Sequence, residues 1–130
     1  MIRKKFSWKE RGNSFGYAWQ GIKALFRTEH NAWIHAVITM AVLIASFIFK
    51  VSSIEAAVLV LTIAFVFVTE ILNTAIEKAM DFISIEKHPQ IKLVKDLAAA
   101  AVLVASIAAI VTGALIFLPK VLHYAQSVSK

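Results

Sequence analysis

Residues 56–75 read AAVLVLTIAFVFVTEILNTA, a nearly continuous apolar run that decides the fold. As a helix rising 1.5 Å per residue, a run of this length crosses a hydrocarbon core about 30 Å thick. Two further apolar runs lie on either side of it, at about residues 34–50 and 97–118. The first of these is short and reaches the interface only with its flanking residues. The sequence therefore predicts three transmembrane helices, at about 34–50, 56–75 and 97–118.

The composition supports an all-α integral membrane protein that forms a single membrane domain over residues 1–130. Hydrophobic residues make up 59% of the chain and charged residues 17%, and the mean hydropathy is +0.74. A soluble domain of this size has too little interior to hide so much apolar surface. The chain has no cysteine, which excludes disulfides, thiolate metal sites and cysteine nucleophiles.

The distribution of positive charge predicts the orientation in the membrane. The formal net charge is +6, with seven Lys or Arg residues in segment 1–33 and four in segment 76–96. Residues 50–55 hold one, and the tail after residue 118 holds two. Because Lys and Arg accumulate on the cytoplasmic side, the N-terminus and segment 76–96 are expected in the cytoplasm. This distribution of Lys and Arg along a membrane protein accounts for its net positive charge, so no nucleic-acid partner is expected.

An N-terminal segment at about 12–30 has the pattern of an amphipathic helix lying on the membrane surface. Its apolar residues recur at helical spacing, and its basic residues lie off that stripe. The apolar stripe consists of Phe15, Trp19, Ile22 and Phe26, and the basic residues are Lys23 and Arg27. This pattern predicts one surface helix in addition to the three spans.

Polar residues at the end of the second span form a single stripe. At 100° per residue, Glu70, Asn73, Glu77 and Asp81 fall within an arc of about 80° on one helix. A charged side chain inside a span costs free energy, and such a residue is a functional candidate by default. The alternatives left open are a protonated Glu70 that hydrogen-bonds across a helix interface, and solvated carboxylates at Glu77 and Asp81.

Other polar residues are expected at the same membrane surface. Glu29 precedes the first span, and Lys95 and Asp96 open the third. Carboxylates such as Glu29 and Glu77 suit Mg²⁺ bound together with substrate phosphates. Lys95 suits a phosphate group, and Glu70 suits the acceptance of a hydroxyl proton. A charge pair at a helix start is the alternative for Lys95 and Asp96. His88 is also compatible with a plain loop residue, and His35 with a hydrogen-bonded interfacial residue.

These residues carry a resemblance to a known family. The run Glu70-Ile-Leu-Asn73-Thr74-Ala-Ile-Glu77, followed by Asp81 and then Lys95-Asp96 before an Ala-rich span, resembles the bacterial diacylglycerol kinase and undecaprenol kinase family. The stretch 16–21 (GYAWQG) and Glu29 fit the same pattern, and the tail 117–120 (FLPK) is more similar to the undecaprenol kinase branch. At residues 31–33 (NAW) the chain departs from the Asn-Phe-Arg or Asn-Phe-Gln common in the family.

The resemblance implies a lipid kinase of the bacterial inner (plasma) membrane, multi-pass and homotrimeric. It implies transfer of the ATP γ-phosphate to the hydroxyl of undecaprenol or diacylglycerol at the cytoplasmic interface. Carried over by position, Glu70 is the general base, Asn73 orients the reacting groups, and Glu29 and Glu77 hold Mg²⁺ with the ATP phosphates. The remaining residues implied to contact ATP are Tyr17, Glu86, His88, Lys95 and Asp96. Trp19 is implied to line the lipid entry with its helix, and Glu70 to contact the lipid hydroxyl.

Two other classes of function compete with this interpretation. A small proton- or cation-conducting protein would use Glu70 as an intramembrane relay, but the acidic residues gather at one surface. A non-catalytic helical adaptor would not need four polar residues on one arc. A trimer also has a physical rationale at this stage, because three spans alone offer little interior for Glu70.

Overall fold

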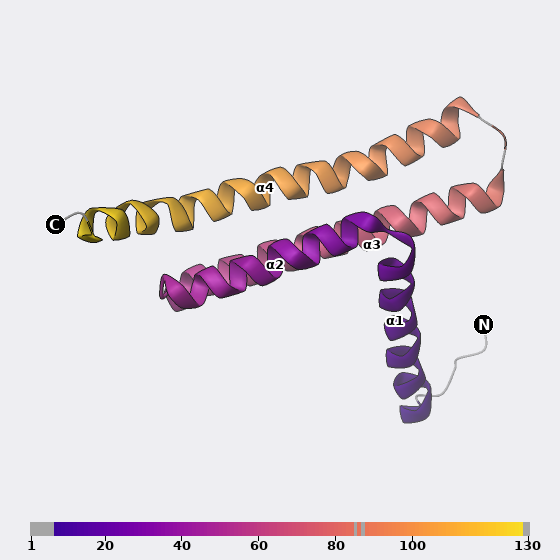
Figure 1. The fold of residues 1–130 in the computed structure, drawn as a ribbon. Helices are drawn as coiled ribbons and strands as arrows, with labels where there is room; N and C mark the ends of the chain where they lie inside the picture. Colours follow the sequence, from indigo (N-terminus) through magenta and orange to yellow (C-terminus); the bar gives the residue numbers. More distant parts are fainter. Residues whose placement is uncertain (1–6, 85, 87, 129–130) are drawn as a thin grey trace.

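The computed structural model describes residues 7–84, 86 and 88–128. Over these residues the regular structure is entirely helical, and the order of helices is α1 (Trp8–Thr28), α2 (His30–Ile48), α3 (Ser53–Ile83) and α4 (Pro89–Val128) (Figure 1). The last three are each long and apolar enough to cross a membrane. The predicted all-α membrane fold, with three spanning helices and one N-terminal helix, is confirmed.

The helix ends differ from the predicted segments for local reasons. α1 begins at Trp8, earlier than the expected residue 12, because the Ser7 hydroxyl accepts a hydrogen bond from the Glu10 backbone N–H at 3.4 Å and caps the helix. α1 ends at Thr28 because Glu29 has an extended backbone, with φ −113° and ψ 115°. α2 starts directly after it, at His30. Glu29 therefore occupies the corner between α1 and α2.

Aromatic packing fixes this corner. The Trp33 indole N–H donates to the Phe26 carbonyl oxygen at 2.8 Å, and the two rings meet edge to face with centroids 5.2 Å apart. Phe26 also lies 6.4 Å, centroid to centroid, from Phe67 of α3. As a result α1 runs crosswise to the three long helices at the end where α2 begins (Figure 1). Its Phe15 and Trp19 side chains are exposed, as a helix lying in the headgroup plane requires.

α3 and α4 form the principal packing unit, an antiparallel pair (Figure 1). α3 begins with a reciprocal cap between Ser52 and Glu55. The buried residues of α4 are Ala98 and Ala105, and such small side chains let neighbouring helices approach closely. α4 continues through Pro119 to residue 128, well past the predicted span 97–118. Its 40 residues extend about 60 Å, roughly twice the hydrocarbon thickness.

The end of α3 and the start of α4 lie beyond the level of α1. In Figure 1 the end of α3 and the start of α4 project past the corner where α1 meets α2. α4 begins at Pro89, as expected for a proline in the first turn of a helix, where its missing N–H costs nothing. The predicted polar residues of both helices are therefore carried at one end of the bundle.

Candidate active site

A cavity of about 390 Å³ brings the polar stripe of α3 together with α2 and α4. We call it the polar pocket. α3 contributes Glu70, Asn73 and Glu77, three of the four residues of the predicted stripe. The remaining lining residues are Asn31, Ile34 and His35 of α2, and Ala99, Val102, Leu103 and Ser106 of α4. Each long helix thus supplies one wall of the pocket.

Glu70 is the most deeply placed polar residue of the pocket. Its side chain is 1% exposed, and its Oε2 atom has no hydrogen-bond partner among the residues that the structure describes. The same is true of Asn73 Oδ1 and Thr74 Oγ1. A buried polar atom left without a partner costs about 1–3 kcal/mol, so a group of them needs an explanation. Glu70 and Asn73 line the pocket, so a polar ligand group entering it would provide their unpaired atoms with a partner.

This burial corrects one expectation from the sequence. A single chain was expected to offer too little interior for Glu70, and that expectation is wrong. The side chain is covered within one chain, where Thr69 and Thr74 of α3 are also buried. The need to bury Glu70 is therefore not an argument for a trimer.

Glu77 is held in place by its neighbour one helical turn earlier. The Asn73 Nδ2 atom donates to Glu77 Oε1 at 3.1 Å. Because residues four apart on a helix face the same side, this bond directs the carboxylate into the polar pocket. Three ionisable side chains lie close enough to Glu70 to act on its carboxyl group electrostatically, namely His35, Glu29 and Glu77. The pocket thus concentrates carboxylates and one imidazole.

Asp81 belongs to a different cavity, although it shares the stripe with Glu70. This cavity of about 660 Å³, which we call the hairpin pocket, lies where α3 ends and α4 begins. Four residues that the sequence assigned to ATP line it, Glu86, His88, Lys95 and Asp96. The other lining residues are Asp81, Ser84, Pro89, Ile91 and Lys92. The predicted stripe is therefore divided between two cavities along α3.

Ion pairs connect the two sides of the hairpin pocket. Lys95 Nζ donates to Asp81 Oδ1 at 2.8 Å and so joins α4 to α3. Lys92 pairs with Asp96 four residues further along α4. The Lys92–Asp96 pair is exposed, and in the second pair Asp81 is exposed while Lys95 is partly exposed. Exposed pairs contribute only about 0–1 kcal/mol to stability. The cations therefore remain available for exchange to a phosphate group.

The other predicted site residues lie outside both cavities. Glu29 is half-buried at the corner between α1 and α2. Tyr17 and Trp19 are exposed on α1, 69% and 58% respectively, and Lys23 Nζ lies 5.6 Å from the centre of the Trp19 ring. Neither aromatic residue lines the polar pocket or the hairpin pocket.

The carboxylates at the site suit a magnesium ion that is held partly by a nucleotide. Across the described part of the chain, no three His, Asp or Glu side chains converge as a complete metal cage. Mg²⁺ does not require such a cage, because it commonly binds one or two carboxylates together with substrate phosphates. Glu77 in the polar pocket and Glu29 nearby supply carboxylates of that kind.

Three polar residues that line the polar pocket were not singled out as site residues from the sequence, and they come from the other two helices. Asn31 and His35 lie four residues apart on α2, and Ser106 faces them from α4. His35 was interpreted as an interfacial residue. The i, i+4 spacing of Asn31 and His35 directly after Glu29 could have indicated a second polar helix face.

An apolar groove adjoins the polar pocket. This cavity of about 260 Å³ shares His35 and Ser106 with the polar pocket and runs away from it between α2, α3 and α4. Apart from Thr39 and Thr62, its other residues are apolar or glycine: Ile38, Val42, Leu59, Ile63, Val66, Ala109, Ile110, Gly113 and Ala114. The polar pocket thus continues into an apolar groove within the bundle.

Comparison with known proteins identifies the family. Residues 16–117 match the family described as prokaryotic diacylglycerol kinase. The chain is 45% identical over 107 residues to the undecaprenol kinase of Bacillus subtilis, covering 82% of this chain and 87% of that protein. It is 39% identical over 123 residues to the diacylglycerol kinase of Synechocystis, covering 92% of this chain and 70% of that protein. It is 38% identical over 107 residues to the diacylglycerol kinase of Pseudomonas aeruginosa, covering 82% and 86%. The chain therefore belongs to the prokaryotic diacylglycerol kinase family and is a lipid kinase.

Proposed function

We propose that this kinase transfers the γ-phosphate of ATP to the hydroxyl group of a membrane lipid alcohol, either undecaprenol or diacylglycerol. The observation that carries the proposal is the buried carboxyl group of Glu70, whose Oε2 atom lacks a partner among the described residues. It lies in a polar pocket that continues into an apolar groove. A lipid alcohol has the same division, with one hydroxyl group at the end of a long apolar chain.

In the proposed reaction Glu70 acts as the general base. Its carboxylate accepts the proton of the lipid hydroxyl, and the hydroxyl oxygen forms a bond to the γ-phosphorus. The bond from the γ-phosphorus to the bridging oxygen breaks, and ADP leaves with that oxygen. Asn73 orients the reacting groups, since it already bonds Glu77 through one side of its amide. Phosphoryl transfer depends mainly on positioning and charge neutralisation, so a sparse polar site is sufficient.

The nucleotide is proposed to occupy the hairpin pocket and the adjoining end of the polar pocket. Glu86, His88, Lys95 and Asp96 would contact it, and they share one cavity. Tyr17 is retained in this set as a proposal, although it lies on the exposed side of α1. Glu29 and Glu77 would hold Mg²⁺ with the phosphates. When bound, this ion neutralises the charge of the transferring phosphoryl group.

The same proposal sets the protein in the bacterial inner membrane, with the N-terminus and the α3–α4 connection in the cytoplasm. The support is the concentration of Lys and Arg in segments 1–33 and 76–96. Trp19 and its helix would border the entry of the lipid from the bilayer, and Trp19 is exposed for such a contact. A homotrimer remains part of the proposal. The broad exposed apolar faces of α2, α3 and α4 are compatible with contacts between subunits.

The alternative of a proton- or cation-conducting protein has no support from the family match. The related proteins are named as lipid kinases. Among the residues that the structure describes, the carboxylates near Glu70 are those of Glu29 and Glu77, and both lie toward one end of the bundle. A relay across the membrane would need further ionisable groups along the apolar groove, whose lining beyond His35 contains none.

The experiment that tests the proposal is a phosphate-transfer assay with the purified protein in lipid micelles. Mg²⁺ and γ-labelled ATP are supplied, and undecaprenol and diacylglycerol are offered in separate reactions. Label in the lipid fraction establishes the transfer and names the acceptor. A folded protein that labels neither lipid would contradict the proposal.

His35→Ala is expected to raise KM for the lipid alcohol by roughly tenfold and to leave KM for ATP unchanged. His35 stands where the polar pocket meets the apolar groove, and its ring packs edge-on against Phe67 at 6.4 Å. Loss of one hydrogen bond to the acceptor hydroxyl corresponds to about 1 kcal/mol or somewhat more. Steady-state kinetics with each substrate varied in turn measure the effect.

The matched control is Lys9→Ala, which removes an exposed side chain of α1 that lines none of the described cavities. It is expected to change neither KM value. An equal rise of both KM values in His35→Ala would argue against a contact with the lipid hydroxyl.

A further inference from the structure

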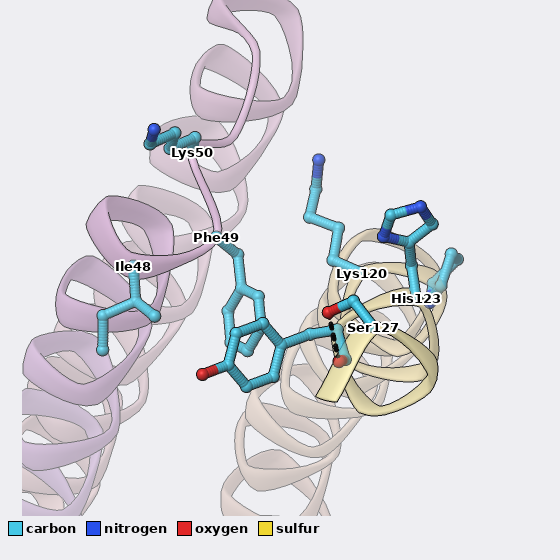
Figure 2. Close-up of a pocket in the computed structure, with 8 residues that line it drawn as sticks. Ile48, Phe49, Lys50, Lys120, His123 and Ser127 are labelled. Carbon is cyan, nitrogen blue, oxygen red and sulfur yellow. Dashed lines mark hydrogen bonds between the residues drawn. The ribbon is translucent and has the colours of Figure 1, made fainter. Parts of the chain in front are cut away.

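A separate cavity of about 380 Å³ lies at the end of the bundle opposite the polar pocket. We call it the distal pocket. It is formed between the end of α2 with its following turn and the C-terminal part of α4 (Figure 2). Its lining residues are Ile48, Phe49, Lys50, Pro119, Lys120, His123, Tyr124 and Ser127. Residues assigned above to ATP, Mg²⁺ or the acceptor are absent from this lining.

The rim of the distal pocket carries basic side chains from two elements. Figure 2 shows Lys120 and His123 on α4 on one side and Lys50 on the turn on the other, with the Lys50 side chain extending away from α4. Lys120 Nζ lies 3.1 Å from Glu55 Oε2, and the Lys120 side chain is 25% exposed. Within the described residues no carboxylate forms an ion pair with Lys50. The rim therefore carries two lysines and a histidine, with Glu55 as the partner of Lys120 alone, and it has a net positive charge.

The floor of the distal pocket is apolar and aromatic. The Phe49 ring meets Tyr124 edge-on with centroids 6.4 Å apart, and it meets Phe117 at 6.3 Å. Ile48 and Pro119 extend this surface. A cationic rim above an aromatic floor matches an amphiphile, with its anionic group at the rim and its first methylene groups against the rings.

The backbone at Lys50 adds a further observation. Lys50 has φ 47°, in the left-handed region, at the position after the end of a helix where glycine is the usual residue. A side chain at this position costs free energy relative to glycine. The chain nevertheless has a lysine there, beside the pocket. In addition Lys120, His123 and Tyr124 lie beyond residues 16–117, the segment that matches the kinase family.

We propose that the distal pocket binds the phosphate group of an anionic phospholipid, with Lys120 and His123 at the phosphate, Lys50 adding positive charge from the facing turn, and Phe49 and Tyr124 against the glycerol and upper acyl chain. Pairing of ammonium groups with a phosphate gives charge-assisted hydrogen bonds, the stronger class of hydrogen bond. The site is independent of the phosphate-transfer reaction, because it lies at the other end of the bundle. Its function would be to hold the α2–α3 turn against the end of α4.

The test is native mass spectrometry of the purified, delipidated protein, titrated with phosphatidylglycerol or with phosphatidylcholine of the same acyl chains. The wild-type protein is expected to bind phosphatidylglycerol about tenfold more tightly. The double variant Lys50→Asn/His123→Gln is expected to lose this preference. Asparagine tolerates the left-handed backbone at residue 50, and the Lys120–Glu55 pair is retained, so the variant is designed to fold. Lys120→Gln is a second variant, expected to weaken binding of phosphatidylglycerol in the same direction.

The matched control is Lys78→Gln, which removes one exposed positive charge near the other end of α3 and is expected to keep the preference. The phosphate-transfer rate of each variant in zwitterionic micelles reports on folding separately. Equal binding of the two lipids by the wild type, or an unchanged preference in the double variant, would overturn the proposal. Inorganic phosphate is added in a further titration. Displacement of the lipid by millimolar phosphate would also overturn the lipid as the ligand, in favour of a free anion.

Discussion

Glu70→Gln is expected to lower kcat for phosphate transfer by about 10²–10⁴-fold, the usual contribution of a general base. Glutamine keeps the size and shape of the side chain at a position that is 1% exposed. Its amide cannot accept the hydroxyl proton. Binding of ATP is expected to change little, because the nucleotide contacts proposed above lie in the hairpin pocket.

The variant is measured in the labelled-ATP assay beside Glu10→Gln, a carboxylate on the exposed face of α1. Glu10→Gln is expected to keep wild-type turnover. Because Glu70→Gln replaces an ionisable buried group with a neutral one, its thermal unfolding midpoint is expected to equal or exceed that of the wild type. Wild-type turnover in Glu70→Gln would remove Glu70 as the base.

Glu77→Gln is expected to lower the rate by roughly 10²-fold at ordinary Mg²⁺ concentrations, since a metal that neutralises phosphoryl charge contributes several kcal/mol. Part of the loss should be recovered as Mg²⁺ is raised, because the metal would then be held by Glu29 and the phosphates alone. The glutamine carbonyl can still accept the hydrogen bond that Asn73 donates to Glu77 Oε1. The local helix face is therefore expected to remain intact.

The informative measurement for Glu77→Gln is the dependence of rate on Mg²⁺ at saturating ATP. A shift of the half-saturating Mg²⁺ concentration to higher values is expected for this variant and not for Glu10→Gln. A fall in rate with an unshifted Mg²⁺ dependence would instead assign Glu77 to positioning. An unchanged rate would contradict any part for Glu77 in the reaction.

Periodicity along single helices was sufficient to predict much of this protein. The apolar runs predicted the three long helices. The spacing of Glu70, Asn73 and Glu77 predicted that they share a face, and they line one cavity. These predictions succeed because they depend only on residue spacing within one helix and on the length of an apolar run.

Predictions that required contacts between helices were incomplete. The sequence grouped Asp81 with Glu70, whereas Asp81 pairs with Lys95 across the α3–α4 connection and lines the hairpin pocket. The resemblance implied site roles for Tyr17 and Trp19; both lie on α1 outside the polar and hairpin pockets, and their roles stay proposals. The direction of α1 depends on the extended backbone at Glu29 and on the contact of Trp33 with Phe26. Neither feature produces a periodic signal.

The sequence by itself determined the fold class, the helical segments and the polar face of α3, because hydropathy and helical spacing are local properties of the chain. The expected orientation rests on the placement of lysine and arginine. Only the tertiary structure decided that one chain buries Glu70, that His35 and Ser106 join it, and that the polar pocket continues into an apolar groove. The physical reason is that these properties depend on how three helices rotate and approach one another. That geometry is set by packing between small side chains such as Ala98 and Ala105 of α4 and the facing helix.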